Sequence, residues 1–148
     1  MNIFALLAFL AGTTIAVQMA MNAQLGSALK SPMLASVCAF FSAVVVTALA
    51  VVFTVRDYPS INTVKTVPVY LWFTGGLLSA LAISMFYYLI PRMGLGAMIS
   101  FALSGQLLVA VLCGHFGWFD VPQKPVNFPK LMGVAALISG VVLINSEH

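Results

Sequence analysis

Long runs of apolar residues constrain this chain more than any other feature. A helix needs roughly 20 residues to cross the hydrocarbon core of a bilayer. Five runs approach or exceed that length, at about 3–28, 32–55, 68–90, 94–117 and 129–145. Only 6% of the residues are charged, whereas ordinary soluble domains contain about 25%. The sequence therefore predicts an all-α integral membrane protein with five transmembrane helices in a single domain, residues 1–148.

The runs are continuously apolar, which favours helices over the alternating strands of a membrane barrel. The fifth span is the weakest, because its dense apolar stretch, 131–144, is short for a full crossing. The opening "MNIFALLAFL" has no basic residue before its apolar core, so we expect the first span to be retained rather than cleaved. Helix boundaries are predicted at Ser31-Pro32, Pro68, Pro91 and Pro129.

The basic residues near the span ends favour a cytoplasmic N-terminus by a narrow margin. Those on the N-terminal side are Arg56, Lys65, Lys124 and Lys130, and those on the other side are Lys30 and Arg92. Insertion in both orientations therefore stays open. Five spans put the two termini on opposite faces, so a second copy inserted upside down completes a ten-helix antiparallel dimer with inverted symmetry, as in many secondary transporters.

A polar stripe runs along the first predicted helix. Its members recur every fourth residue and are Thr14, Gln18, Asn22 and Gly26. Polar groups that face lipid cost several kcal/mol unless they find partners, so the stripe must face protein or a wet cavity. Two interpretations remain: the amides line a solute cavity, or they join helices by hydrogen bonds worth about 0.6 kcal/mol each.

Other spans supply further candidate residues. Ser104 and Gln106 lie in the fourth span, and Tyr87 stands near the end of the third. Arg92 stands in the short connection between two spans. Its charge either reaches the lipid headgroups at the interface or attracts an anionic solute. No Asp or Glu lies within any predicted span, which disfavours proton-coupled cation export through a buried carboxylate.

No covalent chemistry is predicted. Cys38 and Cys113 lie inside spans without metal-ligand spacing and are interpreted as small buried packing residues. No catalytic triad, metalloprotease motif or carboxylate pair lies in the membrane, so the chain is not expected to be an enzyme, and no cofactor is expected. The sequence does not identify a coupling ion.

Several segments together resemble the YdcZ-like family, a bacterial inner-membrane family of the drug/metabolite transporter superfamily. These segments are "VQMAMNAQLGSALKSP", "WFTGGLLSALAIS", "IPRMGLGAMISFALSGQLLVAVLCGHFGWF" and "LMGVAALISGVVLI". The matching positions include Gln18 with Asn22, Gly75-Gly76, Gly94 and Gly105-Gln106. The resemblance implies five helices per chain, ten-helix units and export of small solutes across the bacterial inner membrane.

These observations predict a multi-pass exporter that works by alternating access as an antiparallel homodimer. Its substrate is expected to be a small polar metabolite, neutral or anionic, and its other partners membrane lipid and a second chain; nucleic acid is not expected. The candidate substrate-binding residues are Thr14, Gln18, Asn22, Tyr87, Arg92, Ser104 and Gln106. The competing interpretations are a passive channel and a membrane scaffold or accessory subunit that transports nothing.

Overall fold

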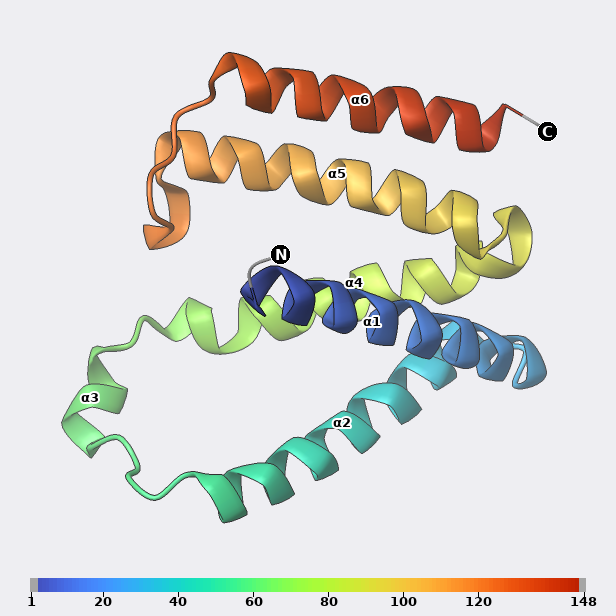
Figure 1. The fold of residues 1–148 in the computed structure, drawn as a ribbon. Helices are drawn as coiled ribbons and strands as arrows, with labels where there is room; N and C mark the ends of the chain where they lie inside the picture. The colour runs from blue at the N-terminus through green and yellow to red at the C-terminus, as the bar shows by residue number, and fades with distance from the viewer. Residues whose placement is uncertain (1–2, 147–148) are drawn as a thin grey trace. The chain divides into compact units, whose positions relative to one another are not determined.

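A computed structural model describes residues 3–146 (Figure 1), which form helices joined by short connections and include no β-strand. In chain order the elements are α1 (Ile3–Ala28), α2 (Pro32–Thr54), α3 (Ile61–Thr66), α4 (Val69–Met93), α5 (Leu95–Phe116), the 3₁₀ turn η1 (Trp118–Asp120) and α6 (Phe128–Asn145). The predicted all-α architecture is confirmed.

Four of the helices in residues 3–146, namely α1, α2, α4 and α5, are long and apolar enough to cross a membrane. Helix α6 has 18 residues, which corresponds to about 27 Å of helix, slightly less than the roughly 30 Å of a hydrocarbon core. The structure thus supports a multi-pass membrane protein with four spans. A fifth crossing by α6 remains a prediction.

The prediction that a helix ends at Pro91 is wrong, because α4 continues through this proline to Met93. Proline removes only the hydrogen bond to the carbonyl four residues earlier, and in the last turn few bonds remain to be lost. The guanidinium Nη1 of Arg92 donates to the carbonyl oxygen of Tyr88 at 2.6 Å, so this carbonyl of the last turn has a hydrogen-bond partner. The helix ends where Gly94 adopts a φ of 85°.

The connections contain short helices that the sequence did not predict. Helix α3 lies in the link between α2 and α4, and the side chain of Ser60 caps it by accepting a hydrogen bond from the Thr63 amide at 3.2 Å. The turn η1 follows α5 directly. These pieces are three to six residues long, so apolar periodicity gives no signal for them.

The described residues form two compact units, divided between Arg92 and Met93. In the first unit α1 and α2 meet at a tight turn and separate toward their other ends (Figure 1). A Cβ atom added to Gly26 would lie 3.3 Å from the Cα of Pro32 and 3.4 Å from the Cβ of Ala35. Ala35 is fully buried at this contact. The close approach of the helices therefore depends on glycine at position 26.

The turn between α1 and α2 closes with a Schellman pair of hydrogen bonds. The amide of Ser31 donates to the carbonyl of Gly26 at 2.9 Å, and the amide of Lys30 donates to the carbonyl of Ser27 at 3.2 Å. This geometry puts Lys30 at a φ of 52°, in the left-handed region that glycine adopts most easily. Ser31 then caps α2, its hydroxyl accepting from the Leu34 amide at 3.3 Å.

A pair of serines joins α2 to α4. The hydroxyl of Ser84 donates to the hydroxyl oxygen of Ser36 at 2.9 Å, and Ser36 donates onward to the carbonyl of Pro32 at 3.1 Å. Ser36 is buried. This contact has the small polar residues typical of helix association in lipid.

In the second unit α5 and α6 pack side by side (Figure 1). At one end the side-chain amide of Asn145 donates to the hydroxyl of Ser100 at 3.1 Å and to the carbonyl of Val141 at 2.8 Å. At the other end the connecting loop is held to α5, because the amide of Val126 donates to Nδ1 of His115 at 3.1 Å. The helix pair is therefore tied by hydrogen bonds near both of its ends.

Candidate functional site

Three of the candidate residues, Gln18, Asn22 and Tyr87, come together in the first unit and are called the amide cluster below. Asn22 Nδ2 donates to Gln18 Oε1 at 2.7 Å and to the Tyr87 hydroxyl at 2.9 Å. The Tyr87 hydroxyl donates to Gln18 Oε1 at 3.4 Å. Gln18 and Asn22 lie one turn apart on α1, and Tyr87 reaches them from α4. The cluster thus links two helices through neutral polar groups.

The amide cluster leaves hydrogen-bonding capacity unused. Tyr87 is 1% exposed, whereas Gln18 and Asn22 are each half-buried. Within residues 3–146 the Nε2 group of Gln18 and the Oδ1 atom of Asn22 have no hydrogen-bond partner. An amide nitrogen carries two donors and an amide oxygen accepts two bonds. The cluster can therefore both donate to and accept from another molecule.

The rest of the polar stripe divides into different environments. Thr14 is exposed, and its hydroxyl donates to the carbonyl of Leu10 at 2.9 Å within the same helix. Thr14 and Gln18 border an open hollow of about 400 Å³ along α1. Gly26, at the other end of the stripe, is buried against α2. Thr14 is thus placed beside the amide cluster without bonding to it.

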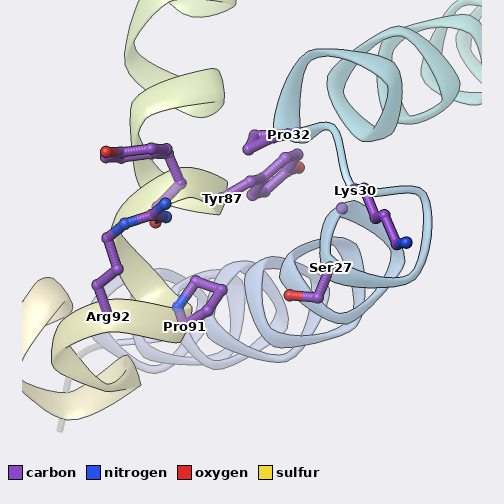
Figure 2. Close-up of a pocket in the computed structure, with 8 residues that line it drawn as sticks. Ser27, Lys30, Pro32, Tyr87, Pro91 and Arg92 are labelled. Carbon is purple, nitrogen blue, oxygen red and sulfur yellow. Dashed lines mark hydrogen bonds between the residues drawn. The ribbon is translucent and has the colours of Figure 1, made fainter.

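A second hollow, called the basic hollow below, has a volume of about 520 Å³ (Figure 2). Its lining residues come from the ends of α1, α2 and α4 and are Gly26, Ser27, Lys30, Pro32, Tyr87, Tyr88, Pro91 and Arg92. The two cations stand on opposite sides of Tyr87 in this view. Since the hydroxyl of Tyr87 also belongs to the amide cluster, this one side chain connects the two sites.

Arg92 is held in place by its neighbour Tyr88. Its guanidinium carbon lies 3.5 Å from the centroid of the Tyr88 ring, a cation–π contact, and its Nη1 donates to the Tyr88 carbonyl. Within residues 3–146 neither Arg92 nor Lys30 forms an ion pair. Their charges are therefore not neutralised by the part of the chain that the structure describes.

The candidates Ser104 and Gln106 lie on α5, in the second unit. Ser104 is half-buried, and its hydroxyl donates to the carbonyl of Ser100 at 2.9 Å. Gln106 is exposed, and its side chain forms no hydrogen bond within residues 3–146. The role of Ser104 and Gln106 in binding stays a prediction.

Two residues of the polar arrangement were missed in the sequence. The sequence marks Lys30 only as a charge near a span end, whereas in the structure it lines the basic hollow. Asn145 was not singled out, although it joins α6 to Ser100 on α5; an amide at the end of an apolar run was the signal. No group of three or more His, Cys, Asp or Glu side chains gathers in the described residues, 3–146.

Comparison with known protein families matches residues 3–143 to the family described as "Putative inner membrane exporter, YdcZ". The comparisons with curated proteins and with solved structures gave no match. The family match includes all four long apolar helices and both residues of α1 in the amide cluster. The chain therefore belongs to the YdcZ family and is a multi-pass protein of the inner membrane.

Proposed function

We propose that this protein exports a small polar solute, neutral or anionic, by alternating access in an antiparallel homodimer. The family description supports membrane export. The observation that carries the proposal is the amide cluster, in which Gln18 and Asn22 are half-buried in a membrane-spanning helix and each keeps a polar atom unused. A solute with one acceptor and one donor would complete this hydrogen bonding.

The pattern of bonds favours solute binding over helix association alone. An amide group that faces lipid without a partner costs roughly 1–3 kcal/mol, and a hydrogen bond between membrane helices contributes only about 0.6 kcal/mol on average. The Ser36–Ser84 contact shows how this chain joins two helices with small side chains. Two long amides with spare Gln18 Nε2 and Asn22 Oδ1 atoms are more than such a contact needs.

Tyr87 suggests how binding is coupled to movement. The solute is held first by the unused Gln18 Nε2 and Asn22 Oδ1 atoms; when it also accepts from Asn22 Nδ2, it displaces the Tyr87 hydroxyl and loosens the link between α1 and α4. Interhelical hydrogen bonds in membranes are at most about 1.7 kcal/mol. That is small enough for the link to break and form again in each transport cycle.

A second, inverted copy would complete the transport path. Gln18 and Asn22 remain partly exposed in one chain, and their polar atoms must be shielded from lipid. A helix of the second copy can provide this shielding. The narrow charge difference between the two membrane faces is consistent with insertion in both orientations. This homodimer is part of the proposal.

The test begins with purified protein in detergent and a panel of small polar metabolites, scored by thermal stabilisation. Solutes that stabilise the protein are then loaded into proteoliposomes. We expect Asn22→Ala to weaken solute binding about tenfold, the effect of one or two neutral hydrogen bonds of about 0.5–1.5 kcal/mol each, and to reduce transport while the dimer survives. Ser84→Ala is the matched control, since it removes another interhelical bond in the same unit.

Three results contradict the proposal. If no solute stabilises the wild-type protein and none is transported, the scaffold interpretation is favoured. If Asn22→Ala disrupts the dimer while Ser84→Ala does not, the amides serve assembly. Very fast flux without saturation or counter-transport indicates a passive channel.

A further inference from the structure

We infer that the basic hollow is an anion-binding site, which takes a carboxylate or phosphate group between Arg92 and Lys30. The inference that this group belongs to the exported solute rests on the proposed function. The sequence alone left Arg92 with two interpretations, an interfacial charge or an attraction for anions. The structure adds the hollow itself, a second cation and a fixed guanidinium.

The local charge of the hollow is positive. The C-terminal ends of α1 and α4 and the N-terminal end of α2 border it. Helix ends carry about −0.5 charge at the C-terminus and +0.5 at the N-terminus, so these three ends and the two cations sum to about +1.5. The helix ends therefore offset only part of the charge of Lys30 and Arg92, and an anion is the ligand that balances the remainder.

Arg92 is already arranged for binding. The Tyr88 ring supports one face of its guanidinium, and the Tyr88 carbonyl takes one of its five N–H donors. The planar fork of donors matches the two oxygens of a carboxylate or phosphate. A guanidinium that only extended toward lipid headgroups would not need to fold back onto its own helix.

Lys30 occupies a backbone position that disfavours a side chain. Its φ of 52° is the left-handed conformation at the end of α1, where glycine is preferred. In Figure 2 its ammonium extends away from Arg92, beyond Tyr87. Its long, flexible stem allows the ammonium to turn toward an anion in the hollow. A lysine at this strained position is consistent with a role for its charge.

The hollow has the size and location for one end of an organic solute. Its volume of about 520 Å³ falls within the roughly 300–1,000 Å³ of small-molecule sites. Tyr87 forms one wall, and its hydroxyl is hydrogen-bonded to Asn22. An anionic group held by Arg92 therefore lies one side chain away from the amide cluster, which would bind the polar remainder of the same solute.

The first experiment measures binding without transport. The full-length protein in a neutral detergent is titrated with inorganic phosphate and with acetate, and its melting temperature is compared with that in equivalent sodium chloride. We expect a saturable increase for at least one of the two anions. We expect Arg92→Gln to weaken its apparent affinity at least tenfold and Lys30→Gln severalfold. Arg56→Gln is the matched control, because this exposed arginine lies at the far end of α2 and outside the hollow.

Two outcomes overturn the anion site. One is the absence of any increase beyond that in chloride, and the other is an equal increase in the wild type and in both hollow variants. If Arg92→Gln does not fold, the apparent anion affinity of the wild type is compared with that of two other variants. These are Lys30→Gln and the double variant Lys30→Arg with Arg92→Lys, which keeps both positive charges. The conservative variant should retain more affinity than Lys30→Gln.

The second experiment distinguishes a solute from a lipid headgroup, since both carry the same anionic chemistry. The phosphate or acetate titration is repeated in nanodiscs of phosphatidylcholine alone and with phosphatidylglycerol. Equal affinity in both membranes supports a soluble anion. Loss of binding in the phosphatidylglycerol discs, restored by lipid exchange, assigns the site to a headgroup and overturns the solute assignment. If the protein binds the anion but transports no solute, the anion site stands and only the exporter proposal is refuted.

Discussion

Asn22 on α1 donates a hydrogen bond of 2.9 Å to the hydroxyl of Tyr87 on α4, across 65 positions of sequence. This bond joins Asn22 to a side chain that also forms a wall of the basic hollow. Its strength and its replacement by solute are the properties on which the proposed cycle depends.

Replacing Tyr87 by Phe should remove the bonds to Asn22 and Gln18 and leave the buried ring in place. We expect the free energy of unfolding to fall by about 0.6 kcal/mol, and by no more than about 1.7 kcal/mol for a strong interhelical bond. Chemical unfolding in detergent measures this change. Tyr87→Ala, which also removes the ring, should cost about 3–5 kcal/mol; equal losses in the two variants would show that the hydroxyl dominates and contradict this account.

Replacing Gly26 by Val should separate α1 from α2, because even a Cβ atom at this position meets the Pro32 backbone at 3.3 Å. Overpacking of this kind costs about 1–3 kcal/mol. Gly12→Val is the matched control, since a Cβ at Gly12 has nothing within 4 Å in the chain. The melting temperatures of the two variants are compared, and a larger decrease for Gly12→Val would point instead to a contact with a second copy.

Replacing Lys30 by Gly should stabilise the fold and weaken anion binding at the same time. The left-handed conformation at Lys30 costs an L-residue roughly 1–2 kcal/mol, part of which is offset by the greater freedom of glycine in the unfolded chain. We expect a gain of about 0.5–1 kcal/mol in unfolding experiments. Lys30→Ala removes the charge and keeps the backbone penalty, so it should weaken phosphate or acetate binding without any such gain.

Helix α6 should cross the membrane despite its length of 18 residues. Cysteines are placed singly at Asp120 and Ser146, both exposed and on either side of α6, in a background without Cys38 and Cys113. In a variant with basic residues added to one face, so that all molecules insert in one orientation, an impermeant thiol reagent reaches the two positions from opposite faces if α6 spans. Labelling of both positions from the same face only would reduce the chain to four spans.

A third cysteine position tests dual insertion in the same assay. Thr63 lies exposed on α3, in the connection between two long helices. We expect a cysteine there to be labelled from both sides of the membrane, each side reaching part of the population. Labelling from a single side would exclude an antiparallel homodimer.

The sequence predicted the parts of this protein that depend on local chemistry. Apolar runs identified the long helices, and a spacing of four residues put Gln18 and Asn22 on one face of α1. The partner of Asn22 was not predictable, because Tyr87 comes from another helix and the pairing depends on tertiary packing. The helix end assigned at Pro91 was wrong for a local reason: the rule that proline ends helices is weak in the last turn.

The helix-joining contacts between Asn22 and Tyr87 and between Ser36 and Ser84 are between uncharged groups, whereas the basic hollow depends on unneutralised cations. Dissolved salt screens exposed charges over about 8 Å at 0.15 M, and does little to neutral hydrogen bonds. A concentrated-salt wash should therefore strip anions from the hollow while the helices stay packed, which gives a simple route to ligand-free protein for reconstitution.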